Sequence, residues 1–137
     1  MTIDDGTSRY TSPPSEAPTI RVVAMPADTN PAGDIFGGWI MSQMDLAAGS
    51  RAAQRARGRC VTIAVESLTF HQPVVIGDEV SIYTRIIKTG RTSMVIHVET
   101  WRRERHARVS FKVTEGIFTF VAINSERRPR PLPDEGD

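Results

Sequence analysis

The sequence predicts an α+β protein, with one long helix covered by a curved antiparallel sheet of about five strands. Between residues 36 and 56, apolar side chains recur every three or four positions, as they do on one face of a helix. After Gly58 the apolar side chains alternate with polar ones, which is the spacing of a strand. Short turns separate the stretches that follow, and short turns favour antiparallel neighbours. A helix with an apolar stripe then needs a concave sheet to cover it.

The elements are expected in a simple order. Residues 1–18 are polar and carry three prolines, so we expect a mobile tail. One domain is expected over residues 19–124, and residues 125–137 are expected to form a loosely ordered, charged, proline-rich tail. Within the domain we expect strands over residues 19–25, 61–70, 79–89, 93–102 and 109–123, with the helix at 36–56. Gly116 is expected to mark a bulge or bend in the last strand.

Open sheet edges can pair with another chain, so we expect at least a dimer, with two sheets meeting edge to edge.

Composition excludes several other partners. The net charge of +1 across 137 residues gives no field that calls for nucleic acid. The single cysteine, Cys60, rules out a disulfide within the chain, and His71, His97 and His106 lack metal-ligand spacing. A polar amino-terminal stretch and the lack of a long apolar run predict a cytoplasmic protein with no membrane span.

The long helix carries a carboxylate beside its apolar stripe. Asp45 lies four residues after Met41 and three before Ala48, and residues at those spacings share a helix face. Burying an ionised carboxylate without partners is expensive, so a chain that does so is expected to use it. The alternative is a hydrogen-bonded or exposed residue at the stripe edge. The full predicted stripe consists of Ile40, Met41, Met44, Ala47, Ala48 and Ala52.

The start of the helix is also unusual. Asp34 stands where an N-cap is expected, and Gly37 and Gly38 fall in the first turn, whose N–H groups have no helical acceptor. Glycines leave these donors uncovered, and the helix dipole adds partial positive charge, so a negatively charged oxygen can bind there. The alternative is that both glycines only permit close packing.

A resemblance to a known family rests on two runs, PADTNPAGDIFGGWIMSQMDLA and VTIAVESLTFHQPVVIGDEV. Over residues 19–133 the chain resembles the YciA-type bacterial acyl-CoA thioester hydrolases, which are hotdog-fold thioesterases. The resemblance implies hydrolysis of acyl-CoA to free acid and CoA, with an active site at a dimer interface and often a trimer of dimers. It also implies that Asp45 is the catalytic carboxylate. Related animal enzymes carry Asn at the position of Asp34, so two roles remain open for Asp34: helix cap or reaction-site residue.

Thioester hydrolysis needs an attacking oxygen and a site for the resulting oxyanion. Asp45 is the candidate for the first task, either as general base to water or as a nucleophile that forms an anhydride. Burial against its apolar neighbours would make it a stronger base. The backbone N–H of Gly37 or Gly38, donated by the opposite subunit, is the candidate oxyanion donor.

CoA brings phosphates, and the predicted turn at Lys88, Gly90, Arg91, Thr92 and Ser93 combines cations, hydroxyls and a glycine that suit a pyrophosphate. The alternative is a solvated hairpin tip. Ser67 and Thr69 are candidates to line the acyl pocket, Cys60 is interpreted as a packing residue, and no cofactor beyond the CoA of the substrate is expected.

Two other functions compete with hydrolysis. A non-catalytic acyl-CoA sensor of the same fold is the main alternative, although a sensor is expected to carry an attached partner domain. A hydratase of this fold would require an Asp paired with a His near the helix. No His occurs between Gly33 and Gly58.

Overall fold

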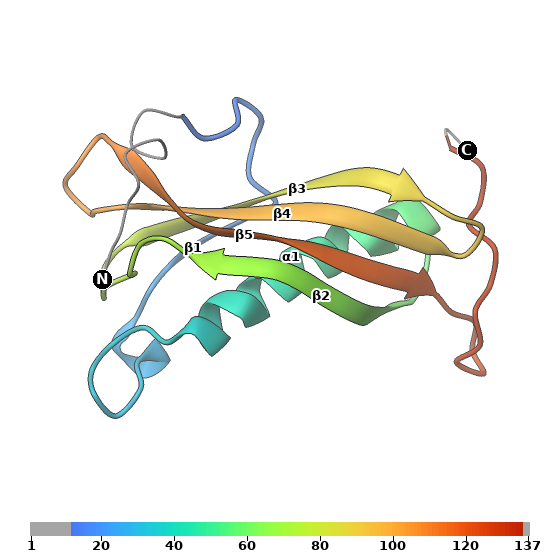
Figure 1. Ribbon diagram of the computed structural model, residues 1–137, viewed down its shortest axis with the longest axis horizontal. Helices are drawn as coiled ribbons and strands as arrows, with labels where there is room; N and C mark the ends of the chain where they lie inside the picture. The colour runs from blue at the N-terminus through green and yellow to red at the C-terminus, as the bar shows by residue number, and fades with distance from the viewer. Residues whose placement is uncertain (1–11, 136–137) are drawn as a thin grey trace.

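One long helix lies across a five-stranded antiparallel sheet (Figure 1). The computed structural model describes residues 12–135. Its elements are β1 (Ile20–Val23), the short 3-10 helix η2 (Pro26–Asp28), α1 (Gly37–Ala56), β2 (Cys60–Phe70), β3 (Glu79–Thr89), β4 (Ser93–Arg103) and β5 (Ser110–Ala122). The strand order is β1-β3-β4-β5-β2, with every neighbouring pair antiparallel. The predicted fold class is confirmed. Of the tail predicted over residues 1–18, residues 1–11 lie outside the described residues.

The core lies between α1 and one face of the sheet. The buried positions of α1 recur at helical spacing and are mostly alanine, which lets the helix approach the sheet closely: Ile40, Met44, Ala47, Ala48, Ala52 and Ala56. Met94, Ile96 and Val98 of β4 are fully buried below it. Met41 departs from the prediction, because 39% of it is exposed. The buried stripe is therefore narrower than the sequence suggested, and it leaves one flank of α1 uncovered.

Two bulges interrupt β2, so its alternation is less regular than predicted. The register with β5 shifts between Thr62 and Ala64, and again between Glu66 and Thr69. Ser67 lies in the second bulge with a φ of 63°. The irregularity predicted at Gly116 therefore belongs to the neighbouring strand, and Gly116 accommodates it. A Cβ on Gly116 would lie 2.5 Å from Leu68 Cδ1.

The carboxy-terminal segment folds back onto the domain, so the prediction of a loosely ordered tail over residues 125–137 is wrong for residues 125–133. Ile123 forms a β-bridge with Pro129, and the Leu132 N–H donates to the Arg91 carbonyl at 2.9 Å. The Arg55 guanidinium donates to the Pro133 carbonyl at 2.7 Å. Figure 1 shows this segment running along the end of the sheet that carries the β3–β4 turn. These long-range contacts leave no local pattern in the sequence.

Candidate functional site

A tight loop before α1 sets the position of the helix start. The Asn30 side-chain oxygen accepts the N–H groups of Ala32 (3.0 Å) and Asp34 (3.1 Å), and the Asn30 N–H donates to the Asp34 carbonyl (2.8 Å). Asp34 is exposed, and the N-cap of α1 is Phe36, which makes no side-chain cap hydrogen bond. The predicted capping role of Asp34 is therefore wrong. The loop is closed by Asn30, which sequence reasoning missed although Asn-Pro is a recognised turn signal.

Gly37 and Gly38 occupy the first turn of α1, as predicted. Aromatic rings pack against both of them. A Cβ on Gly37 would lie 3.3 Å from the ring of Phe70, and one on Gly38 would lie 3.1 Å from the ring of Phe36. Both spacings are tighter than ordinary van der Waals contact. Close packing is thus one reason for these glycines, and the exposed first-turn N–H groups of the helix are a second.

Asp45 lies in the middle of α1 and faces the edge strand β2. Its carboxylate is partly exposed within the protomer, where the sequence had suggested burial. The Thr62 hydroxyl donates to Asp45 Oδ1 at 2.6 Å. Thr62 pairs with Phe120 of β5, whose side chain is buried against the helix, so Thr62 lies on the helix-facing side of the sheet. The sequence alternation marked Thr62 as a polar strand position, but nothing in it indicated a partner 17 residues away.

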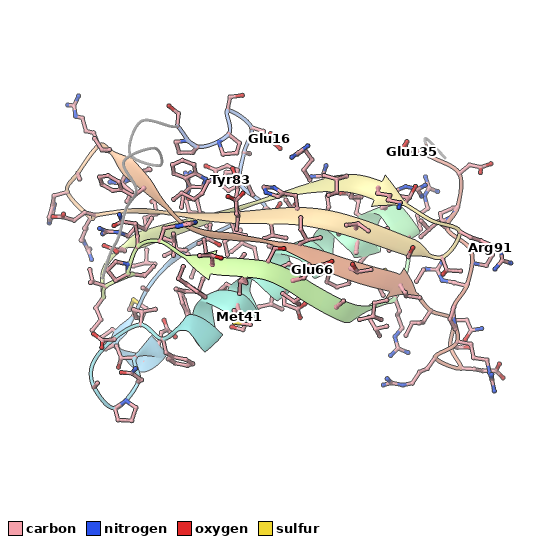
Figure 2. The ribbon with its side chains drawn as sticks, viewed as in Figure 1. Glu16, Met41, Glu66, Tyr83, Arg91 and Glu135 are labelled. Carbon is pink, nitrogen blue, oxygen red and sulfur yellow. The ribbon has the colours of Figure 1, made fainter. Side chains whose placement is uncertain are left out.

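The surface around Asp45 is apolar. Ile63 and Val65 of β2 are 58% and 40% exposed, and Met41 of α1, which Figure 2 labels, is 39% exposed. Scattered apolar side chains are ordinary on a protein surface, but Ile63 and Val65 lie on the edge strand that bonds to Asp45 through Thr62. β2 is 11 residues long at that edge, whereas β1 at the other edge has only 4. Such a long apolar edge is typical of an interface.

Asp45 and the glycines of the same chain are too far apart to act on one carbonyl group. Asp45 comes eight residues after Gly37, which at 1.5 Å per residue is about 12 Å along the helix axis. Oxyanion donors lie about 3 Å from the oxygen that is bonded to the carbon under attack. Within one protomer, Asp45 and the glycine N–H groups therefore cannot serve the same carbonyl group.

Comparison with known proteins places this arrangement in a family. Residues 32–108 match the model of the thioesterase superfamily, a stretch that contains the helix, Thr62 and the β3–β4 turn. The chain is 55% identical over 120 residues to an uncharacterised acyl-CoA thioester hydrolase of Zymomonas mobilis, covering 88% of this chain and 80% of that one. The chain belongs to the thioesterase superfamily.

Further relatives of this superfamily member agree in sequence and in fold. The acyl-CoA thioester hydrolase YciA of Salmonella typhimurium is 47% identical over 120 residues, covering 85% of this chain and 90% of the relative. A hexameric broad-specificity acyl-coenzyme A thioesterase superposes with a TM-score of 0.87 at 42% identity, covering 95% of this chain and 90% of that one. A hexameric hotdog-fold thioesterase of Campylobacter jejuni gives 0.81 at 37% identity, covering 88% and 92%. The predicted family and hotdog fold are confirmed.

The predicted phosphate-binding turn of this thioesterase lies far from the glycines of its own chain. Figure 2 labels Arg91 at the end of the sheet opposite to the start of α1. The Gly90 N–H donates to the Ser93 carbonyl at 2.9 Å, and the Ala122 N–H donates to the Thr92 carbonyl at the same distance. Lys88, Gly90 and Arg91 are exposed, whereas Thr92 and Ser93 are partly buried. The turn is thus held by its own backbone and by β5, and it presents Lys88 and Arg91 to solvent.

Ser67 lies on the outer face of the sheet, away from the helix. It borders a small cavity together with His97, Glu115, Gly116 and Ile117. The Thr69 carbonyl accepts a hydrogen bond from the Thr114 hydroxyl at 2.5 Å. Within one protomer, the apolar cavity beside the helix start is lined by other residues, including Phe70 of the same strand.

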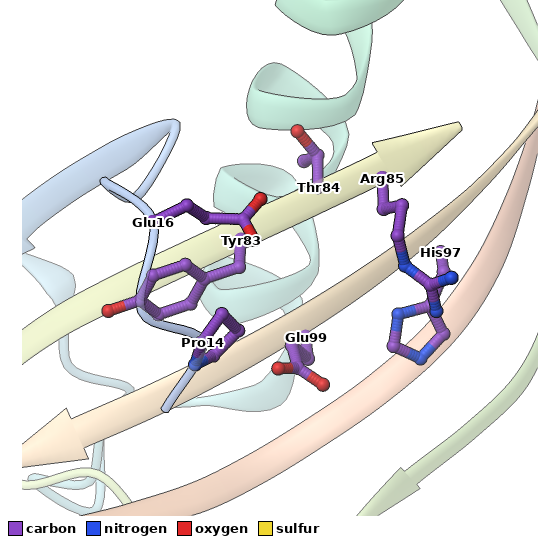
Figure 3. Close-up of a pocket in the computed structure, with 7 residues that line it drawn as sticks. All are labelled: Pro14, Glu16, Tyr83, Thr84, Arg85, His97 and Glu99. Atoms are coloured by element: carbon purple, nitrogen blue, oxygen red, sulfur yellow. The ribbon is translucent and has the colours of Figure 1, made fainter. Parts of the chain in front are cut away.

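The outer face also carries a charged cluster that the sequence did not predict, because its members come from two neighbouring strands. Ligand atoms of His97, Glu99 and Glu115 lie within 4.8 Å of one another. The Lys112 ammonium lies 3.6 Å from Glu99 Oε2 and 3.3 Å from Glu115 Oε2, so a cation is already present between the two carboxylates. Beside this cluster the amino-terminal segment, with Pro14 and Glu16, crosses a cavity of about 240 Å³ (Figure 3).

Two pKa values have a clear physical cause. Partial burial acts to raise the pKa of Glu115, but the hydrogen bond with His97 and the charge of Lys112 outweigh it, so the pKa is lowered from 4.5. Burial raises the pKa of the Cys60 thiol, and the nearby charge of Arg130 only partly offsets this. Cys60 packs partly buried against the core, which fits its interpretation as a packing residue.

In the part of the chain that the structure describes, no helix has both the length and the apolar character needed to cross a membrane. The cytoplasmic location stays a prediction.

Proposed function

We propose that this chain hydrolyses acyl-CoA thioesters to free carboxylic acid and CoA, over a broad range of acyl groups. One observation carries the proposal: a relative known as an acyl-CoA thioester hydrolase is 47% identical over 85% of this chain and 90% of its own length. Such similarity along nearly the whole of both chains leaves little room for a different site. The arrangement of Asp45, Thr62 and the helix start gives the chemistry a physical basis.

The active site lies at the interface of a homodimer. Since Asp45 and the glycines of one chain are about 12 Å apart, a complete site needs one half from each protomer. Pairing of β2 with its copy around a twofold axis would be antiparallel and would cover the exposed Ile63 and Val65. The hexameric relatives support a further assembly into a trimer of dimers.

Asp45 starts the reaction. As a general base, it takes a proton from water while the hydroxide oxygen bonds to the thioester carbon. As a nucleophile, its own oxygen bonds to that carbon, and water then cleaves the resulting anhydride. On either route the carbon–sulfur bond breaks, the electron pair leaves with sulfur, and a proton reaches the CoA thiolate. Thr62 binds one carboxylate oxygen and so leaves the other oriented for the reaction.

The oxyanion of the tetrahedral intermediate is stabilised by the first turn of the partner subunit's helix. The backbone N–H groups of Gly37 and Gly38 point along the helix axis, where the dipole is positive. Glycine at both positions lets a thioester approach the backbone closely. We assign no catalytic task to Asp34, since its side chain is exposed and its backbone belongs to the loop that Asn30 closes.

The same twofold pairing explains how a distant turn can serve the site. In an antiparallel pairing of the two β2 strands, the Cys60 end of one strand lies against the Phe70 end of the other. The β3–β4 turn lies at the Cys60 end, so Lys88 and Arg91 of one protomer approach the glycines of its partner. Two exposed cations and the partly buried hydroxyls of Thr92 and Ser93 suit the phosphates of CoA. The CoA is part of the substrate, and no separate cofactor is needed.

The direct test measures CoA release from a panel of acyl-CoAs with a thiol-reactive dye. Wild type is compared with Asp45→Ala and Asp45→Asn. We expect the turnover of both variants to fall by about a hundredfold or more, because a positioned base contributes that much. Their melting temperatures are expected to stay close to wild type, because Asp45 is partly exposed.

Two outcomes would contradict the proposal at different levels. If wild type binds acyl-CoA but releases no CoA at any chain length, the chain is a non-catalytic acyl-CoA-binding protein. If Asp45→Ala retains full turnover, the chain is a hydrolase whose reacting carboxylate lies elsewhere.

A further inference from the structure

The carboxy-terminal segment carries prolines at alternate positions, namely Pro129, Pro131 and Pro133. A proline has a fixed φ and no backbone N–H, so such a run favours an extended conformation that costs little conformational entropy to order. Between the first and the last proline, only Arg130 and Leu132 have a backbone N–H to donate. The segment is therefore preorganised, and two N–H groups can fix where it lies.

Both of these N–H groups donate to the domain. The Arg130 N–H donates to the carbonyl of Ala122 at the end of β5, and the Leu132 N–H donates to the carbonyl of Arg91 in the β3–β4 turn, each at 2.9 Å. The Leu132 side chain is partly buried and packs against the core. Leu132 therefore joins the segment to the turn by a backbone hydrogen bond and to the domain by apolar contact.

The long helix holds the segment at the next residue. The Arg55 guanidinium, in the last turn of α1, donates to the Pro133 carbonyl at 2.7 Å. Arg55 is partly buried, and a hydrogen bond from a charged donor is stronger than one between neutral groups. Figure 1 shows the segment at the end of the sheet where the β3–β4 turn and the end of α1 both lie. The segment thus connects the helix to the turn.

Part of the turn depends on the segment for its position. The backbone hydrogen bonds that close the turn and join it to β5 are made at Gly90, Thr92 and Ser93. At Arg91, the backbone hydrogen bond described is the one that its carbonyl accepts from Leu132. Loss of that bond would free the backbone that carries the Arg91 side chain, while the rest of the turn stays closed.

We propose that Leu132 and Arg55 are positioning residues for substrate binding, which hold the β3–β4 turn so that Lys88 and Arg91 meet the phosphates of CoA. The inference rests on the proposed function, which assigns those phosphates to this turn. A cation on a fixed backbone loses less conformational entropy when it binds a phosphate than a cation on a mobile one. Release of the segment therefore weakens binding of the phosphate-bearing part of CoA and leaves the chemical step at Asp45 unchanged.

The test compares octanoyl-CoA with octanoyl-pantetheine, which carries the same thioester but lacks the phosphates. Leu132→Pro removes the N–H that bonds to Arg91 and continues the proline run, so the segment keeps its extended conformation. We expect KM for octanoyl-CoA to rise about tenfold, since a hydrogen bond to a charged group contributes about that much to binding. We expect kcat for octanoyl-CoA, and both kinetic constants for octanoyl-pantetheine, to stay at wild-type values. Leu132→Met retains the N–H and most of the packing, and as the matched control it is expected to behave as wild type.

A second residue and a second measurement keep the inference testable if Leu132→Pro fails to fold. Arg55→Met keeps the aliphatic stem and removes the donor to the Pro133 carbonyl, whereas Arg55→Lys keeps a charged donor. Calorimetry with CoA itself reports binding without turnover. We expect CoA to bind about threefold more weakly to Arg55→Met, because this residue acts on the turn only through the segment. Arg55→Lys is expected to recover most of the wild-type affinity.

The outcomes separate this inference from the proposed function. Wild-type binding of CoA by both Leu132→Pro and Arg55→Met, or an equal loss for octanoyl-CoA and octanoyl-pantetheine, means that the segment only supports the fold, and the inference is overturned. Wild-type CoA affinity in the double variant Lys88→Ala/Arg91→Ala places the phosphates elsewhere, which overturns the inference while hydrolysis stands. CoA binding that depends on Leu132, in a protein whose wild type releases no CoA from any thioester, overturns hydrolysis while the positioning role stands.

Discussion

Two aspartates of this chain are held in opposite ways. Asp78, in the turn before β3, is 1% exposed, and its Oδ2 accepts hydrogen bonds from the Val75 N–H (3.0 Å) and the Arg102 guanidinium (3.1 Å). Asp45, in the middle of α1, is partly exposed and is bound by one neutral hydroxyl. Asp78 thus has two donors and a counter-charge, whereas the side-chain hydrogen bond described for Asp45 comes from a neutral hydroxyl.

The difference teaches how to separate a structural carboxylate from a reactive one. A buried carboxylate with a charged partner contributes to the fold, and removing it leaves the partner charge uncompensated. A carboxylate with a neutral donor on an uncovered apolar flank contributes little to the stability of the protomer. Such a carboxylate is desolvated when another surface covers it. The comparison therefore predicts that Asp78 variants lose stability and that Asp45 variants lose activity.

The largest stability effect is expected for Asp78→Ala. The substitution removes the counter-ion of Arg102, whose side chain is 18% exposed, and leaves the Val75 N–H without its acceptor. We expect the free energy of unfolding to fall by about 3 kcal/mol, the lower end of the range for breaking a buried pair. Denaturant unfolding at a fixed protein concentration measures it, because subunit association also contributes to stability.

Glu79→Gln is the matched control for Asp78→Ala. Glu79 is the next residue along the chain and pairs with Arg21 and Arg103 at 3.6 and 3.4 Å near the surface. Its loss is expected to cost less than about 1 kcal/mol. The comparison fails if Asp78→Ala is as stable as this control, or if its folded fraction hydrolyses acyl-CoA far more slowly than wild type does.

A smaller effect is expected for Thr62→Val, which tests how Asp45 is oriented. Valine keeps the shape of threonine and removes the hydroxyl, so the carboxylate loses the hydrogen bond that fixes it. We expect kcat to fall about tenfold with little change in KM, since the bond orients a reacting group rather than the substrate. Thr62→Ser retains the hydroxyl and is expected to recover most of the rate. Wild-type kcat in Thr62→Val would mean that the hydrogen bond has no part in catalysis.

The helix and its carboxylate could be predicted from sequence because they depend on local spacing. Apolar periodicity gave the helix over residues 36–56, and the structure has Gly37–Ala56. The same reasoning placed Asp45 next to the stripe. Strand positions followed from alternation within the chain, so β3 was predicted to the residue at Glu79–Thr89.

Features that depend on distant partners could not be predicted in this way. Asp78 looked like an ordinary turn residue, because its partner Arg102 comes 24 residues later on the next strand. Thr62 bonds to Asp45 only because the edge strand β2 lies beside the helix. Asp34 satisfied a capping rule, but Asn30 closed the loop instead and moved the cap to Phe36. In each case a long-range or competing hydrogen bond determined the local structure. Such a bond cannot be predicted from the spacing of neighbouring residues.

The smallest effect is expected for Glu115→Gln. Glu115 is intermediate between Asp78 and Asp45, because it has a charged partner but remains partly exposed. Glu115 has a charged partner like Asp78, namely Lys112 at 3.3 Å, and it also bonds to His97 at 2.8 Å, but its side chain is 39% exposed. Because its pKa in the folded protein is lowered from 4.5, the carboxylate stabilises the fold above about pH 4.5, and this contribution is lost as the pH falls through the lowered value. The melting temperatures of wild type and Glu115→Gln should therefore differ slightly near neutral pH and converge in acid, with Glu104→Gln, a change at an exposed turn residue, as the control. A gap that persists in acid would mean that the side chain acts through packing rather than through its charge. A gap as large as that of Asp78→Ala would mean that charged partners, and not burial, decide whether a carboxylate stabilises this fold.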